Sequence, residues 1–564
     1  MYVRTSSRKT KDGTVRYLQL AHSEWDADAG ISRPKILFSF GREDQLDRAA
    51  IERLIGALSR LLDPAAALTA AGPADLEVTD SRPIGGTHLL HALWRRLGIE
   101  TAMRGLLAET KLDARTERVL FALVANRALA ASSKLAATDW IANDAHIEGL
   151  EDIGEQPCYR AMDWLTRIEP ILAEQVYFQV TDLLNLEVDL LFFDTTNTYF
   201  ELDEADEPVG RDKHGQVTDD PDQVVKETGF RSHGKSKDGR DDLPQVVVGM
   251  AVTRDGIPVR VWSWPGGTAD STLIRQVKDD MRAWSLSRIV WVADRGFSSR
   301  DNRRELMRGA GGYIIGEKLR SGSAEVKAAL ARPGRYRVIR DNLQVKEVNI
   351  GSDDRFVLCY NPEQAERDAA VRERLLAQLA EAIDGTDTLT KTERARLEGV
   401  VSTKPGLKRF LRVTPGGLLR IDKKKIAEEE NLDGKYLLRS SDPELDSEDI
   451  ALGYKQLLEV ERGWRDMKQV LDLRPIYHRR EDRIRAHVWL CWLALLLMRV
   501  AENTSGQTWN RIRAEAQRIH AVTFTGPAGQ FCKTTQLSKT QRDLFVALGI
   551  DPPKTILDIT PATH

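Results

Sequence analysis

Alternation of apolar and polar residues along the chain marks stretches typical of strands and of helices. Near the start, residues 2–6, 15–21 and 35–40 alternate as short strands. A repeat of apolar residues at helical spacing follows at 44–62. The pattern therefore predicts that residues 1–65 form a β-hairpin region followed by a helix.

Helical periodicity and then alternating strands and helices fill the next part of the chain. Residues 80–185 are mainly helical in pattern and are predicted to form a separate domain. From 186 to 318, short apolar runs typical of buried strands alternate with helices. Three strands precede the first good helix, at 271–284, which predicts a mixed sheet with an antiparallel edge and later parallel strands. The fold class is therefore α/β.

The pattern changes again after residue 318. Strand signals and charged helices in 319–444 predict an inserted domain of strands with helices. One long helix is predicted at 448–470, within a segment, 445–502, that returns to the α/β core. Residues 503–564 are weakly patterned, and no element is predicted there.

Three acidic residues in these patterns suit metal ligation. Asp194 and Asp294 each end an apolar run predicted to be a buried strand, and Glu461 lies in the predicted helix. Carboxylates at strand ends point into the crevice where open α/β sheets bind ligands. Each also has an ordinary structural explanation, a turn or helix cap for the two aspartates and an ion pair with Arg465 for Glu461.

The helix around Glu461 carries a recognisable pattern, because Tyr454, Glu461 and Lys468 are spaced seven apart. This segment resembles the Tyr-(2)-Arg-(3)-Glu-(6)-Lys signature of bacterial insertion-sequence DDE transposases. Further segments resemble the same family in the same order, and the resemblance covers about residues 185–500. These further segments are Phe193-Asp194-Thr195-Thr196, Pro265-Gly266-Gly267-Thr268-Ala269-Asp270, Ala293-Asp294-Arg295-Gly296-Phe297 and Leu473-Arg474-Pro475-Ile476-Tyr477-His478-Arg479-Arg480.

The resemblance implies a ribonuclease-H-like catalytic core, with a mostly β insertion between the second Asp and the Glu. It makes Asp194, Asp294 and Glu461 a triad that binds two Mg²⁺ or Mn²⁺ ions for strand cleavage and strand transfer. It makes Tyr454 and Lys468 contacts to DNA near the cleaved phosphate. The implied partners are double-stranded DNA, as terminal inverted repeats and target, and a second copy of the chain in a homodimeric synapse. End recognition is expected in the helical region 80–185.

The chain departs from the signature at two neighbouring positions. Leu457 stands where the signature has Arg, and Leu458 stands where relatives have Trp. Residues 320–444 also contain no Trp. In some relatives such aromatics hold a flipped base while a DNA hairpin forms, so the hairpin route stays open here.

Two other functions remain possible from the residues alone. A catalytically inactive, domesticated DNA-binding regulator would share the whole pattern. A phosphatase that forms an aspartyl phosphate would use Asp194, but it needs a second Asp where Thr196 stands.

Charge is balanced over the chain but clustered locally. Lys and Arg total 82 against 85 Asp and Glu, a net charge of −3. Basic clusters are candidate contacts to the DNA backbone. Those favoured are Lys235 and Lys237 before the second strand, and Arg474, His478, Arg479 and Arg480 after the catalytic helix.

The cellular setting follows from cysteine usage and from apolar stretches. The four cysteines form no CxxC pair, which fits a reducing cytoplasm. The start of the chain has no apolar signal segment, and the longest apolar stretch, 488–498, is too short to span a bilayer. We expect no membrane association and a bacterial cytoplasmic location, at the nucleoid when DNA is bound.

Overall fold

The chain divides into two compact units in this computed structural model. One unit comprises residues 1–85, 517–542 and 551–564, and the other comprises 86–516 and 543–550. The structure describes residues 1–10, 13–26, 30–62, 76–183, 189–202, 204–281, 284, 289–309, 311–320, 322–526 and 529–561.

The first unit contains two antiparallel sheets. Strands β1 (Tyr2–Thr10), β2 (Gly13–Asp26) and β3 (Ile31–Arg42) form one sheet, and helix α1 (Arg48–Leu62) follows it. The second sheet has the order β20-β19-β18-β4. Residues 503–564, for which no element was predicted, therefore supply most of a sheet. Its strands are β4 (Glu77–Pro83), β18 (His520–Gly526), β19 (Gly529–Thr534) and β20 (Ile556–Pro561).

The second unit is organised around a nine-stranded sheet with the order β12-β13-β14-β17-β11-β10-β5-β8-β9. Strand β10 runs parallel to β5 and β11, whereas β8 and β9 form an antiparallel edge. The predicted mixed sheet is thus confirmed. Every residue of β8 and β9 is buried, as expected for strands covered on both faces. The strands of this half are β5 (Leu190–Tyr199), β8 (Gln245–Val252), β9 (Pro258–Pro265), β10 (Val290–Ala293) and β11 (Gly312–Gly316).

The segment 319–444 extends this sheet and adds a helical lobe. Strand β17 pairs antiparallel with both β11 and β14, so the sheet continues from core to insertion. The expectation of a mostly β insertion is wrong, because helices hold more of its residues than strands do. Its elements are α10 (Ala324–Ala331), β12 (Arg337–Arg340), β13 (Leu343–Val348), β14 (Arg355–Tyr360), α11 (Pro362–Ile383), α12 (Lys391–Ser402), α13 (Pro405–Lys408), β15 (Leu411–Val413), β16 (Leu419–Ile421), α14 (Lys423–Glu430) and β17 (Lys435–Ser440).

The helical lobe has a small core of its own. Leu379 of α11 packs against Val401, Leu407 and Phe410, all of them buried. Helix α11 contains 22 residues, and only Leu379 in it is buried. A few apolar side chains from each helix therefore form the core of the lobe, and most of helix α11 stays outside it.

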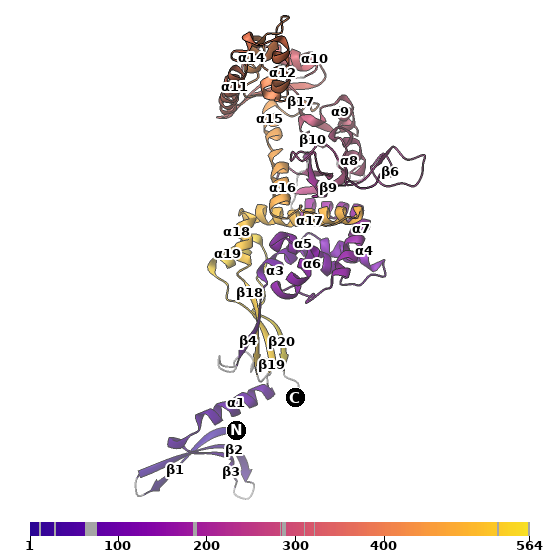
Figure 1. Ribbon diagram of the computed structural model, residues 1–564. Coiled ribbons are helices and arrows are strands. Elements are labelled where there is room, and N and C mark those ends of the chain that lie inside the picture. Colours follow the sequence, from indigo (N-terminus) through magenta and orange to yellow (C-terminus); the bar gives the residue numbers. More distant parts are fainter. Residues whose placement is uncertain are drawn as a thin grey trace. The chain divides into compact units, whose positions relative to one another are not determined.

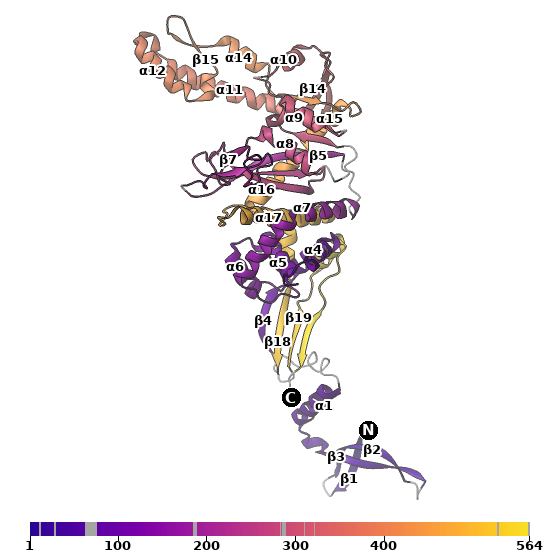
Figure 2. The same cartoon turned by 90° about the vertical axis from the view of Figure 1, so that its right-hand side faces the viewer.

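Helix α17 lies between the sheet and helix α5, and helix α7 packs against α17 and also contacts β9 (Figure 1). The same layering is visible after a quarter turn (Figure 2). By length and composition α17 could cross a membrane, but 94% of its most apolar window is buried inside the protein, as in a core helix. The helices of this layer are α3 (Gly85–Arg96), α4 (Ile99–Ala108), α5 (Thr116–Ala130), α6 (Lys134–Asp139), α7 (Glu155–Leu183), α17 (Glu481–Ser505) and α18 (Trp509–Ala516).

The single helix predicted at 448–470 is two helices in the structure. Helix α15 (Ser447–Lys455) ends at a turn, and α16 (Leu458–Gln469) begins after it. Helix α16 lies against β5 and β8, and Gly463 of this helix faces the side chain of Met250 in β8. The remaining elements are β6 (Val209–Arg211), β7 (Lys226–Thr228), α8 (Ile274–Asp280), α9 (Arg300–Met307) and α19 (Lys539–Leu548).

Candidate active site

Asp194 and Asp294 occupy equivalent positions on neighbouring strands. Strands β5 and β10 are parallel, and the last pair in their register is Phe193 with Ala293. Asp194 is the next residue of β5, and Asp294 directly follows the last residue of β10. Strand β5 then continues, with Asp194 paired in register with Met250 of β8. The sheet therefore brings the two aspartates together at the carboxyl end of β10, where β5 and β10 stop pairing.

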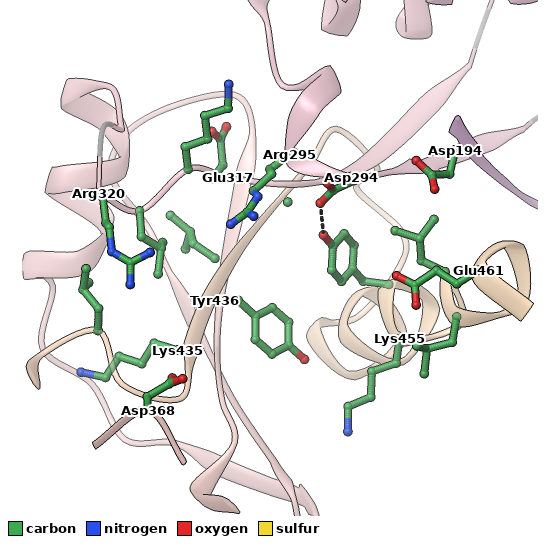
Figure 3. A pocket seen from close by; sticks show the side chains of 18 residues that line it. Asp194, Asp294, Arg295, Glu317, Arg320, Asp368, Lys435, Tyr436, Lys455 and Glu461 are labelled. Atoms are coloured by element: carbon green, nitrogen blue, oxygen red, sulfur yellow. Dashed lines mark hydrogen bonds between the residues drawn. The ribbon is translucent and has the colours of Figure 1, made fainter. Parts of the chain in front are cut away.

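Glu461 faces the same cavity from helix α16. The cavity has a volume of about 900 Å³, and Asp194, Asp294, Tyr454 and Glu461 line it (Figure 3). The Glu461 side chain is exposed, and no ion pair joins it to Arg465 in the described part of the chain. The alternative explanation by that ion pair therefore has no support in this structure.

Tyr454 links helix α15 to the second aspartate. Its hydroxyl donates a hydrogen bond to Asp294 Oδ1 at 3.3 Å, and burial, the charge of Asp294 and this bond raise the pKa of the phenol. Its ring stacks on Tyr436, with centroids 6.0 Å apart. A Cβ at Gly316 would lie 2.4 Å from the Tyr454 hydroxyl, so only glycine leaves room for the ring. Tyr454 is thus fixed beside Asp294.

A lysine from the loop before β8 lies against the first aspartate. Lys237 Nζ is 3.5 Å from Asp194 Oδ1 and 3.3 Å from Asp270 Oδ2. It also donates to the carbonyl and hydroxyl of Thr195, at 2.7 Å and 2.6 Å. Burial raises the pKa of Asp194, as do the charges of Asp294 and Asp270, while Lys237 opposes the change. The Lys237 ammonium thus offsets part of the cost of ionising a buried carboxyl group that lies near two others.

The next residue of that loop pairs with two predicted DNA contacts. Asp238 accepts from Lys468 Nζ at 3.0 Å and from Arg474 at 2.7 Å. Burial lowers the pKa of Lys468, as do the positive charges of Arg474 and Lys237, while Asp238 opposes the change. The structure therefore gathers Lys237, Lys468 and Arg474 at one place beside the aspartates.

Other predicted DNA contacts lie outside this cluster. His478 is half-buried, 6.0 Å from the ring of Tyr159, and burial with nearby positive charges lowers its pKa to about 4. Arg479 and Lys235 are exposed, and Arg480 pairs with Asp482. The structure therefore groups only some of the basic residues that the sequence singled out.

The site also includes residues that the sequence did not single out. Asp270 accepts from the Thr195 hydroxyl at 2.8 Å, although its motif was recognised only by resemblance. Asp238 carried no signal, since a lone loop aspartate has none. Arg295, which follows Asp294 in the chain, lines the cavity, and so do Tyr436 and Lys455, which only the fold brings there.

A second cavity, of about 950 Å³, adjoins the first in the insertion. Four residues line both cavities: Leu319, Arg320, Leu432 and Lys435. The walls of the second cavity are rich in cations, with two glutamates among them. The cations are Arg320, Lys327, Lys408, Arg409, Lys425 and Lys435.

The carboxylate oxygen atoms of Asp194 and Asp294, which line the cavity, suit hard divalent cations. The lysine ammonium already held there by Asp194, Asp270 and Thr195 shows that this end of the cavity accommodates a cation through oxygen atoms. No three His, Cys, Asp or Glu side chains among the described residues lie close enough together to hold one ion. The donor types fit Mg²⁺ or Mn²⁺, but the three carboxylates do not surround a single point in this structure.

Comparison with known proteins gives two family matches. Residues 3–68 match the IS1634 family transposase N-terminal domain, and residues 223–497 match the transposase DDE domain. The second match includes Asp294 and Glu461 and begins after Asp194. No curated protein matches the chain. One similar solved structure is a piggyBac transposase synaptic complex with hairpin DNA, at 10% sequence identity and a TM-score of 0.33, covering 77% of this chain and 78% of that one.

The two family matches, in this order along one chain, define a transposase with a DDE domain. The chain belongs to the insertion-sequence DDE transposases, and its N-terminal region is of the IS1634 type.

Proposed function

We propose that this transposase cleaves and joins DNA at the ends of its insertion sequence, with divalent ions held by Asp194, Asp294 and Glu461. One observation carries the proposal. Two aspartates lie at equivalent positions on neighbouring parallel strands, and a helix glutamate lines the same cavity. A mixed sheet with carboxylates at this edge supports a ribonuclease-H-like core.

The chemistry needs an activated oxygen nucleophile and a stabilised leaving oxygen on opposite sides of one phosphate. Two divalent ions, when bound, supply both effects. Asp194, Asp294 and Glu461 would together hold the two ions. The Tyr454 hydroxyl orients Asp294. In the first reaction water would attack the phosphorus, and the bond from phosphorus to the 3′-oxygen would break, which leaves a 3′-hydroxyl and a 5′-phosphate. In the second reaction that 3′-hydroxyl would attack a phosphorus of the target strand and displace the target's 3′-oxygen, so that one phosphodiester replaces another.

Basic residues around the aspartates would hold the DNA backbone. Tyr454 bonds Asp294 and Lys237 lies against Asp194, while Lys468 and Arg474 pair with the residue after Lys237. All four would contact phosphates near the cut. Lys235, Arg479 and Arg480 would contact phosphates further away. His478 is neutral at physiological pH, because its pKa is lowered to about 4, so it would contribute a hydrogen bond rather than a charge. Such contacts position the duplex without reading its sequence.

The two adjoining cavities give the DNA a path beyond the cut. The second cavity is lined by six cations and shares Arg320 and Lys435 with the first. This local excess of positive charge occurs in a chain with a net charge of −3. A strand leaving the triad would follow this groove into the insertion, past Lys425 of the basic cluster at 423–425.

The proposal includes the partners expected for such an enzyme. Terminal inverted repeats would be recognised by the N-terminal part, including the helical region 80–185, and two copies of the chain would hold two ends together. The reaction would take place in the bacterial cytoplasm on nucleoid DNA. A catalytically inactive DNA-binding regulator is the alternative that the test must separate.

The test uses the purified full chain and a duplex that carries the terminal inverted repeat of the element. Cleavage is followed on denaturing gels with Mg²⁺, with Mn²⁺ and with a chelator. We expect cleavage at the repeat boundary with either metal and none with the chelator. Asp194→Asn should bind the duplex and leave it uncut. Binding without cutting in every metal would reject the proposal and support the regulator, whereas hydrolysis of small phosphate esters alone would indicate a phosphatase.

A further inference from the structure

The loop 234–242, which precedes β8, is fixed at its base. Ser232 and Gln245 form a bridge beneath it. A Cβ at Gly234 would lie 2.1 Å from the carbonyl oxygen of Gly266, so the two backbones touch where only glycine fits. The loop turns at residues 237–239, where Gly239 has a φ of +73° that favours glycine. Its tip is therefore held at a defined place beside the site.

The first residue of the tip places a positive charge beside Asp194. The Lys237 ammonium has four oxygen contacts between 2.6 and 3.5 Å, from Asp194, Asp270 and both oxygens of Thr195. The Thr195 hydroxyl accepts from Lys237 and donates to Asp270, so Asp270 holds this arrangement in place. A cation surrounded by carboxylate, carbonyl and hydroxyl oxygens resembles a bound metal ion in its electrostatics.

The second residue of the tip places a negative charge between two cations. Both carboxylate oxygens of Asp238 lie within 3.1 Å of Lys468 Nζ, and one accepts from Arg474 at 2.7 Å. The side chains of Asp238 and Lys468 are only 20% and 14% exposed, so little water screens the pair. Lysine and arginine around an oxyanion form the usual setting of a DNA phosphate.

We infer that Lys237 and Asp238 stand in for a divalent cation and for a DNA phosphate while the site holds neither. The inference rests on the proposed function and concerns the regulation of the same site. Asp270 and Thr195 are positioning residues that hold Lys237. In the free protein, Lys237 thus neutralises the aspartates and Asp238 neutralises Lys468 and Arg474. The loop tip must move when a divalent cation and DNA bind.

Binding of the cation and binding of DNA are coupled, because Lys237 and Asp238 are adjacent in the chain. A divalent ion at Asp194 repels the Lys237 ammonium, and movement of Lys237 shifts the adjacent Asp238. Lys468 and Arg474 then lose their carboxylate partner and can contact a phosphate. In the other direction, a phosphate on Lys468 and Arg474 displaces Asp238 and draws Lys237 away from Asp194. Metal and DNA should therefore each tighten the binding of the other.

The first test measures Mn²⁺ binding to the full chain without DNA, by the paramagnetic resonance signal of the free ion. Lys237→Met should bind Mn²⁺ about tenfold more tightly than wild type, because two partly exposed ion pairs no longer oppose the metal. Lys213→Met, which removes the charge of an exposed lysine outside the site, should match wild type. Equal or weaker binding by Lys237→Met would overturn the inference, as would absence of Mn²⁺ binding from every variant.

The second test measures binding to a duplex of unrelated sequence over a range of salt concentrations, without metal. Asp238→Asn should raise the affinity at 50 mM salt about tenfold and steepen the salt dependence by roughly one to two phosphate contacts. Asp242→Asn is the matched control, since it removes the same charge from the same loop but from a partner of Arg240. An Asp238→Asn affinity at or below that of wild type would show that Asp238 only clamps the loop.

Neither measurement requires DNA cleavage. A chain that never cuts DNA would fail the proposed function and could still show both binding changes. A chain that cuts DNA but shows neither change would retain the proposed function and overturn the inference. Thermal unfolding of each variant, with Lys237→Gln and Asp238→Ser as second substitutions, separates a lost contact from a lost fold.

Discussion

Replacement of the buried Lys134 by methionine should stabilise the protein, in a way that depends on pH. Lys134 begins helix α6 and is 5% exposed, and no ion pair to it is found among the described residues. Burial, with the positive charge of Arg127, lowers its pKa from 10.5 to about 7. The difference corresponds to a cost of about 5 kcal/mol when the native protein must hold the ammonium, at roughly 1.36 kcal/mol per pH unit.

The sign of the pH effect follows from which state holds the proton. Below pH 7 both states are protonated, and the full cost lowers the stability of wild type. Between pH 7 and 10.5 the unfolded chain keeps a proton that the native protein has lost, so wild-type stability rises with pH relative to Lys134→Met. At pH 9 roughly 2 kcal/mol of the cost remains. The neighbouring thiols of Cys158 and Cys491, with pKa values raised to about 11, stay neutral throughout.

The assay is the midpoint of thermal unfolding at pH 6 and at pH 9. The unfolding entropy of the larger unit is about 0.9 kcal/mol per degree, from typical values per residue. Lys134→Met should therefore melt about 5 °C above wild type at pH 6 and about 2 °C above it at pH 9. Lys111→Met, the same change at an exposed lysine, should leave the midpoint unchanged at both. This reasoning would be refuted if the difference in unfolding midpoint between Lys134→Met and wild type were the same at both pH values. It would also be refuted if the variant were less stable than wild type.

Two further predictions concern single contacts. Tyr454→Phe removes the hydrogen bond to Asp294 and should slow single-turnover cleavage about 10- to 100-fold, the worth of a hydrogen bond to a charged group; unchanged cleavage would show that this bond does not orient Asp294. Glu481→Gln leaves Arg211, which is 2% exposed, without its carboxylate and should lower the free energy of unfolding by about 3–5 kcal/mol in denaturant titrations. A loss below 1 kcal/mol would show that the backbone carbonyls around Arg211 satisfy it.

The elements that carry the aspartates could be predicted from sequence because burial fixes their pattern. Residues 190–193 and 290–293 are continuous apolar runs, as strands covered on both faces require. A polar residue at the end of each run has to lie at the sheet edge. The adjacency of Asp194 and Asp294 then follows from parallel pairing of the two strands.

Long-range partners could not be predicted, because periodicity shows which residues are buried and not what buries them. Strand β4 pairs with β18, more than 400 residues later, and neither pattern specifies the other. The pairing of Asp238 with Lys468 depends on a loop conformation set by glycine contacts. The break between α15 and α16 was missed as well, since apolar spacing continues across the turn.

The central claim is that Glu461 acts with the two aspartates in metal-dependent cleavage. The most direct measurement compares cleavage of the inverted-repeat duplex by wild type, Glu461→Gln and Glu459→Gln in Mg²⁺, with duplex binding measured in parallel. Glu459 is the matched control, because it lies on the same helix, pairs with Arg462 and is not among the residues that line the cavity. The account predicts that Glu461→Gln binds DNA and fails to cut while Glu459→Gln cuts as wild type does. Cleavage by Glu461→Gln at the wild-type rate would contradict it.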